Sequence, residues 1–201
     1  MGSRGDDRRR FAEEFLPRIA ATAEDEGFSQ QVSPGGRRWE WVKLISLTVR
    51  AAVLLSEMTP RNVRGGVDVQ AYGAIYLDQV EQRLREVGQR HSDAATLMAP
   101  LRAWGSTFTR DGTYRFRWSA DPESRVEELA GDLRSFAAFA TAIRDVTDLS
   151  AARLARSRIR KHVTAGLAPN YTTPQVASLI AEMNTNTATG TGVEPRRRHE
   201  P

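Results

Sequence analysis

The chain has 201 residues, a formal net charge of +4 and no cysteine. The lack of cysteine excludes disulfides, thiolate metal sites and thiol nucleophiles. Hydrophobic residues make up 40% of the chain and charged residues 27%, which suits one ordinary domain with a buried core. The start, Met1 to Arg10, is not followed by an apolar stretch, and the most apolar window, residues 41–55, is too short to span a membrane. We therefore expect a cytoplasmic protein without a membrane segment.

Apolar residues recur at helical spacing near the N-terminus. Phe11, Phe15 and Ile19 stand four residues apart, which predicts a helix over residues 7–26. The segment 37–58 is apolar nearly all round, a pattern that is typical of a helix buried in the middle of its domain. We therefore predict that this segment is the central core helix.

Two further helices are predicted before the middle of the chain. Over residues 69–90, apolar side chains recur at intervals of three and four, and a shorter apolar face predicts a helix over residues 93–104. Aromatic residues of these segments are of the type found at oligomer interfaces, namely Trp39, Trp41, Tyr72 and Tyr76. A homo-oligomer is therefore one expectation, although burial within a single chain explains the same residues.

The period changes to alternation around Asp111-Gly112, a pair that favours a tight two-residue turn. This pattern predicts a β-hairpin over about residues 106–118. Tyr114, Phe116 and Trp118 fall on one side, where we expect them to pack on the helices. Arg115 and Arg117 fall on the other side, where they are available to a partner or to nucleic acid.

A strong helix start follows at Asp121-Pro122-Glu123, and apolar spacing extends the predicted helix to about residue 146. Two more helices are predicted over residues 148–165 and 173–183. The fold class expected is therefore mainly α, a single multi-helix domain or helical bundle with one inserted hairpin. Its domain covers residues 8–183, between a disordered leader, 1–7, and a disordered tail, 184–201.

No pattern in the sequence announces catalysis. The histidines lack metal-ligand spacing, no glycine-rich loop is suited to cradle phosphates, and no nucleophile elbow is present. We therefore assign no catalytic, cofactor-binding or metal-binding residue and expect a protein that is not an enzyme. An enzyme with an acid–base site scattered over His91, Asp111 and Glu128 remains the least favoured alternative.

The predicted helix 148–165 carries a cluster of basic residues, which comprises Arg153, Arg156, Arg158, Arg160 and Lys161. A basic stripe of this kind suits an acidic partner protein or the phosphates of nucleic acid, and it is equally compatible with a solvated surface. The leading functional hypothesis is a non-enzymatic helical adaptor or assembly component that binds another protein within a larger complex. The alternative is a nucleic-acid-binding protein that uses this helix together with Arg115 and Arg117.

Overall fold

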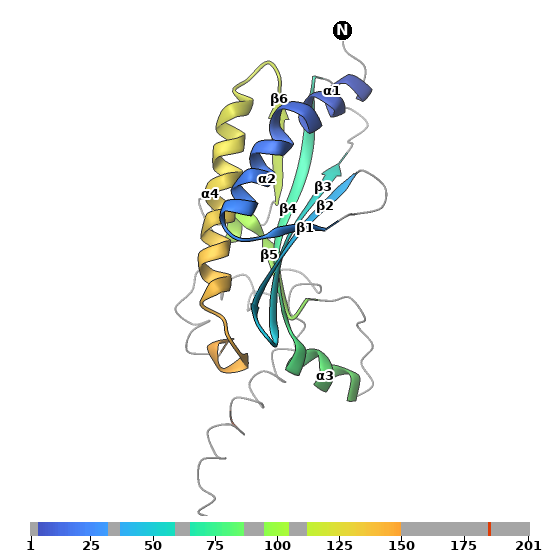
Figure 1. Ribbon diagram of the computed structural model, residues 1–201. Coiled ribbons are helices and arrows are strands. Elements are labelled where there is room, and N and C mark those ends of the chain that lie inside the picture. Colours follow the sequence, from blue (N-terminus) through green and yellow to red (C-terminus); the bar gives the residue numbers. More distant parts are fainter. Residues whose placement is uncertain are drawn as a thin grey trace, which may run out of the picture.

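In the computed structural model of the chain, the residues described are 4–31, 37–58, 65–86, 95–104, 112–149 and 185. Over these residues the chain forms a six-stranded antiparallel sheet, and helices cover one of its faces (Figure 1). The strand order is β1-β2-β3-β4-β5, and β6 pairs with β4 beside β5. The expected mainly α fold, an all-helical bundle with one inserted hairpin, is therefore wrong.

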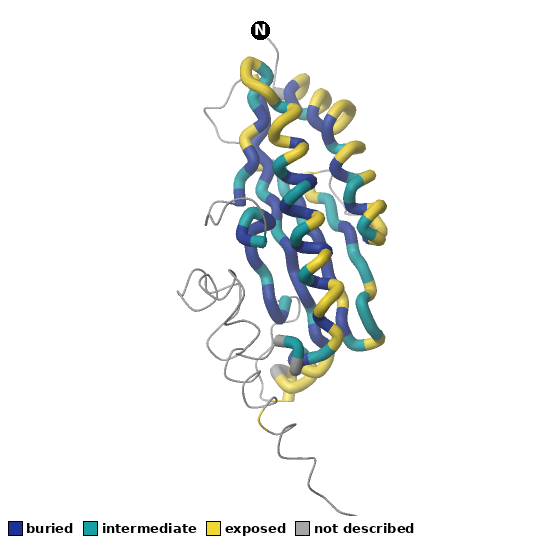
Figure 2. Tube along the Cα trace, turned by 90° about the vertical axis from the view of Figure 1, so that its left-hand side faces the viewer, coloured by how far each residue is buried: buried dark blue, intermediate teal, exposed yellow. Residues whose placement is uncertain are grey.

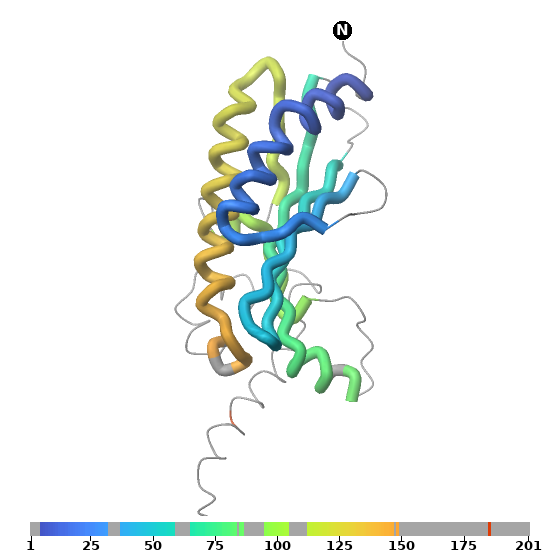
Figure 3. The backbone as a smooth tube through the Cα atoms, in the orientation of Figure 1, coloured from blue at the N-terminus to red at the C-terminus, as the bar shows by residue number. Residues whose placement is uncertain are grey.

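The N-terminal helix is confirmed. It consists of α1 (Arg4–Arg10), a π-helical turn (Phe11–Phe15) and α2 (Leu16–Asp25), which run on as one rod beside the sheet (Figure 3). It begins inside the segment that was expected to be a disordered leader. Its Phe11, Phe15 and Ile19 are at most 2% exposed, as the four-residue spacing requires. Gly27, with φ +81°, turns the chain away from the helix.

The segment predicted as the central helix is a β-hairpin, made of β2 (Arg38–Ser46) and β3 (Val49–Met58); the short β1 (Ser29–Gln31) pairs with β2. The register sets Trp41 opposite Val53, and both side chains are fully buried on the face towards the helices. The neighbouring Val42 and Ala52 face the other way. Both faces of these strands carry apolar residues, so the segment is apolar all round. Buried helices and strands with two apolar faces share this pattern.

The predicted helices 69–90 and 93–104 are also corrected. β4 (Gly66–Leu77) is the central strand of the sheet, and only α3 (Asp78–Glu86) follows as helix. β5 (Leu97–Pro100) and a 3₁₀ turn, η2 (Leu101–Ala103), replace the second helix. Alternate residues of β4 from Val67 to Leu77 point to the helices, so the true period is two.

β6 (Thr113–Arg117) lies within the predicted hairpin, and it pairs with β4, with Tyr114 opposite Val69. The other half of that hairpin lies outside the described residues. The helix start after β6 is confirmed: α4 (Pro122–Thr141) begins at the predicted residue, and a 3₁₀ turn, η3 (Val146–Leu149), follows it. The rest of the predicted basic helix, the predicted helix 173–183 and nearly all of the predicted tail lie outside the described residues.

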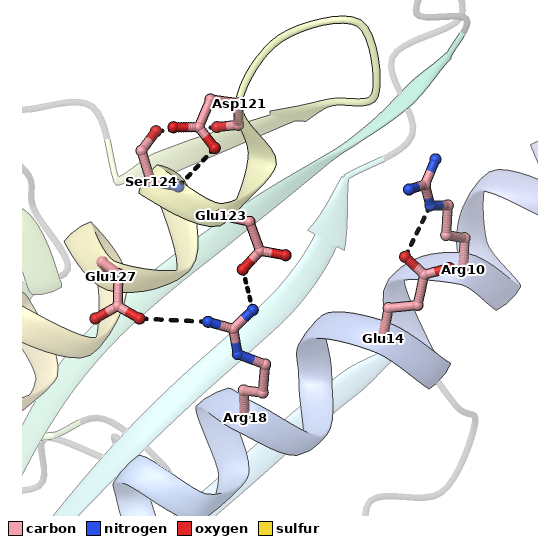
Figure 4. A network of polar contacts seen from close by, with 7 residues as sticks. All are labelled: Arg10, Glu14, Arg18, Asp121, Glu123, Ser124 and Glu127. Carbon is pink, nitrogen blue, oxygen red and sulfur yellow. Dashed lines mark hydrogen bonds and ion pairs between the residues drawn. The ribbon is translucent and has the colours of Figure 1, made fainter.

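The core lies between the sheet and the two helical rods (Figure 2). As predicted, Tyr114 and Phe116 are fully buried on the helix side, and Trp118 stacks on Phe15 with ring centroids 5.6 Å apart. The rods are also joined at the surface, where Arg18 of α2 forms ion pairs with Glu123 and Glu127 of α4 (Figure 4). Aromatic contacts with the N-terminal rod therefore hold β6, and surface ion pairs join that rod to α4.

Candidate functional site

A pocket of about 450 Å³ opens where β6, η2 and the first turn of α4 meet. Its lining is strongly basic, and we call it the arginine pocket. The lining residues are Arg102, Thr113, Arg115, Arg117, Ala120, Asp121, Ser124 and Arg125. Four arginines from three segments of the chain therefore line one cavity.

Strand alternation brings two of these arginines to the pocket. Because Tyr114 and Phe116 are buried against the helices, the residues between and beside them, including Arg115 and Arg117, point to the opposite face of β6. Arg115 is the exposed residue of the strand. The arginine positions are thus a consequence of how the core is packed.

The start of α4 supplies the opposite wall. Asp121 is the N-cap residue, and its Oδ1 accepts a hydrogen bond of 3.2 Å from the backbone N–H of Ser124 (Figure 4). The Ser124 hydroxyl donates back to the Asp121 carbonyl at 2.9 Å. These two bonds hold the Asp121 carboxylate and the Ser124 hydroxyl at the N-terminus of α4, next to Arg125.

Arg117 is anchored by its Nη1 atom. This nitrogen lies 2.6 Å from the Asp68 carboxylate and donates to the carbonyl oxygens of Val67, at 3.4 Å, and Phe116, at 3.0 Å. The Asp68 side chain is 9% exposed, so the pair is largely shielded from water. Because all the contacts described use one nitrogen of a five-donor group, the fork retains further donors.

Arg102 and Arg125 share one carboxylate. Arg102 Nη2 lies 3.0 Å from Glu128 Oε1, and Arg125 Nη1 lies 2.6 Å from Glu128 Oε2. Arg102 also lies over the Tyr114 ring, with 4.3 Å between its guanidinium carbon and the ring centroid. Glu128 therefore holds two arginines in place and contacts only one nitrogen of each.

A buried polar pair lies beneath Arg102. The Tyr114 hydroxyl donates a 2.7 Å hydrogen bond to Asp132 Oδ2, and Asp132 is fully buried in α4. Burial is the main cause that raises the pKa of Tyr114 above its ordinary value, and the negative charge of Asp132 adds to it. The tyrosine therefore stays protonated, and its ring supports the Arg102 guanidinium.

The sequence identified part of this site. Arg115 and Arg117 lie in the pocket, whereas the predicted binding residues Arg153, Arg156, Arg158, Arg160 and Lys161 lie outside the described residues. Of the scattered acid–base set, Glu128 holds two pocket arginines, while His91 and Asp111 lie outside the described residues. Arg102, Arg125 and Ser124 were not anticipated, because they come from segments whose neighbourhood to β6 only the fold reveals.

The predicted aromatic interface anchors are divided between the two faces of the sheet. Trp41 is fully buried and Trp39 packs on the same core. Tyr72 and Tyr76 are half-buried on the opposite face, where the Arg50 guanidinium lies 4.6 Å from the Tyr76 ring centroid. A role for them in an oligomer stays a prediction.

Within the described residues, no cluster of three or more potential metal ligands is found. In the same part of the chain, every helix is too short or too polar to cross a bilayer. Comparisons with protein-family models, curated proteins and solved structures found no match for this chain. Its function must therefore be argued from its own geometry.

Proposed function

We propose that this is a non-enzymatic binding protein whose arginine pocket takes up a phosphoryl group of its ligand. The observation that supports this proposal is that four arginines line one cavity of about 450 Å³. The planar fork of arginine matches the oxygens of a phosphoryl group and binds them with two parallel hydrogen bonds.

The charge balance favours binding of an anion over a purely structural network. Of the residues that line the pocket, four are arginines and one, Asp121, is acidic. The contacts described for Arg102, Arg117 and Arg125 each use a single nitrogen. Donors thus remain for a ligand, and the carboxylates keep the arginines in place before it arrives.

The shape favours a single phosphoryl group over a nucleic-acid backbone. Nucleic acid is bound by rows of basic groups along an extended surface, whereas small ligands are bound in concave sites. The adaptor hypothesis remains a prediction. In the form that fits the pocket, the partner protein presents a phosphoryl group. Nucleic-acid binding through residues 148–165 also remains a prediction.

Isothermal titration calorimetry at low ionic strength tests the proposal, with inorganic phosphate and pyrophosphate as probes. Arg115→Gln removes an exposed arginine of the lining, and Arg134→Gln removes an exposed arginine of α4 that does not line the pocket. We expect wild type and Arg134→Gln to bind pyrophosphate alike. Arg115→Gln should bind it about tenfold more weakly, as loss of one charge-assisted hydrogen bond implies.

Two results would contradict the proposal. One is the absence of heat from either anion up to millimolar concentrations. The other is an equal loss of affinity in Arg115→Gln and Arg134→Gln, which would mean that the anions sense only the net charge of the protein. A short DNA duplex serves as a third probe, and tighter binding of the duplex than of pyrophosphate would favour the nucleic-acid alternative.

A further inference from the structure

The arginine pocket contains a feature that a site for a bare phosphate ion does not need. The carboxylate of Asp121 lines the cavity together with the four arginines. It is held there by its hydrogen bond from Ser124 N, so it cannot turn away without uncapping α4. A negative charge in the lining repels an anion. It becomes favourable only if the ligand also presents a hydrogen-bond donor.

The size and the lining of the cavity restrict the rest of the ligand. A volume of about 450 Å³ lies in the range of sites for small organic molecules, and a bare phosphate ion would fill only a small part of it. As described, the lining holds no aromatic side chain and one alanine as its only apolar residue. The polar groups of the lining, together with the aliphatic stems of its arginines, suit a ligand part that carries hydroxyl groups on a small carbon skeleton.

We infer that the ligand is a small phosphorylated sugar or polyol, an inference that rests on the proposed function. The phosphoryl group lies on the arginine forks, and a hydroxyl of the ligand donates to the Asp121 carboxylate. Carboxylates that accept hydrogen bonds from sugar hydroxyls are a common way to recognise such groups. Ser124 Oγ, whose proton is donated to the Asp121 carbonyl, can still accept a hydrogen bond from another hydroxyl of the same molecule.

The test compares ribose 5-phosphate, inorganic phosphate and adenosine monophosphate by isothermal titration calorimetry. Asp121→Asn keeps the size and the helix-capping ability of the side chain but removes its charge. Glu123→Gln is the matched control, because this exposed residue of the same turn pairs with Arg18 and does not line the pocket. Urea unfolding of each variant confirms that the fold is retained.

We expect wild type to bind ribose 5-phosphate at least tenfold more tightly than inorganic phosphate. Asp121→Asn should lose most of this preference, because it weakens binding of the sugar phosphate while binding of inorganic phosphate stays equal or improves. Glu123→Gln should change the affinity for both probes by the same small factor.

The two proposals fail in different ways. If neither probe binds, the proposed phosphoryl site itself is wrong. If inorganic phosphate binds but ribose 5-phosphate binds no more tightly, or if Asp121→Asn weakens both equally, only the sugar-phosphate assignment is overturned. If adenosine monophosphate binds more tightly than ribose 5-phosphate, the cavity accepts a base, and the restriction to a purely hydroxylic ligand is wrong.

Discussion

Gly73 makes the packing of the sheet against α4 directly testable. It lies in the middle of β4, opposite Val53, and faces the helices. A Cβ atom built on Gly73 would lie 2.5 Å from Cδ2 and 2.6 Å from Cε2 of the Phe136 ring. Phe136 is itself fully buried and packs edge-on against Trp104, with ring centroids 5.1 Å apart, so it has little room to retreat.

The substitution Gly73→Ala should therefore destabilise the protein. Overpacking of a tight core costs about 1–3 kcal/mol, and the better strand propensity of alanine offsets about 0.5–1 kcal/mol of this loss. We expect a net loss of about 1–2 kcal/mol in the free energy of unfolding. Gly131→Ala is the control, since nothing lies within 4 Å of its added Cβ and it sits in the interior of α4. There the same change should stabilise by about 0.5–1 kcal/mol.

Urea unfolding measures both changes as shifts of the midpoint at constant slope. Phe136→Leu completes a double-mutant cycle, because a smaller side chain should make room for the new methyl group. We expect Phe136→Leu to cost at least about 0.5 kcal/mol less in the Gly73→Ala background than in wild type. Strict additivity, or a Gly73→Ala protein as stable as wild type, would show that the ring does not lie against this glycine.

Three further variants test the electrostatic side of the structure by the same unfolding measurement. Tyr114→Phe removes the hydrogen bond to buried Asp132 and should cost about 1–3 kcal/mol at neutral pH. Because the pKa of Tyr114 is raised in the folded state, the unfolded chain loses this proton first; wild-type stability should fall as pH rises above about 10, and Tyr114→Phe should lack this component. Arg117→Ala strands the largely buried carboxylate of Asp68 and should cost about 1–3 kcal/mol, partly restored by lysine. Arg18→Ala should cost less than about 1 kcal/mol, because its ion pairs lie at the surface; a larger loss would mean that they hold α2 on α4.

The sequence allowed the elements with a local signal to be predicted. α4 was predicted from its cap and proline, and the N-terminal helix from phenylalanines spaced by four. Segment 37–58 was predicted to be a central buried helix, but it is a hairpin in which β3 is largely buried and Trp41 is the only buried residue of β2. The turn between its strands contains no glycine, proline, asparagine or aspartate. The one turn residue is Ser46, whose Oγ accepts a hydrogen bond from Thr48 N at 3.3 Å, and serine is a weak signal of a reversal.

β4 was misread for a different reason. Val69, Tyr72 and Tyr76 fit a helical spacing, yet Tyr72 and Tyr76 lie on the face away from the helices and Val69 on the face towards them. The glycine at 73, inside an otherwise apolar run, was the available signal for a strand, because it marks a close approach by another side chain. Pairing with strands that are distant in the sequence decides between helix and strand here, and no short stretch of the sequence shows that pairing.

The candidate site shows the same division between local and long-range information. Apolar and polar residues alternate along β6, and this pattern correctly predicted that Arg115 and Arg117 lie on the polar side. Arg102 and Arg125 join them only because η2 and α4 pack next to β6 in the fold. A cluster built from separate segments depends on topology, and topology was the part of the prediction that failed.

The packing of β6 also determines how variants of the pocket should behave. A slip of one residue in its pairing with β4 would send Arg115 and Arg117 into the core and expose Tyr114 and Phe116. Since Tyr114 and Phe116 are fully buried, this register is strongly specified, and the arginines are positioned without help from a ligand. In a preorganised pocket, little binding free energy is lost to the ordering of side chains. Substitution of the exposed Arg115 should therefore alter affinity while leaving stability nearly unchanged, whereas substitution of Tyr114 should lower both.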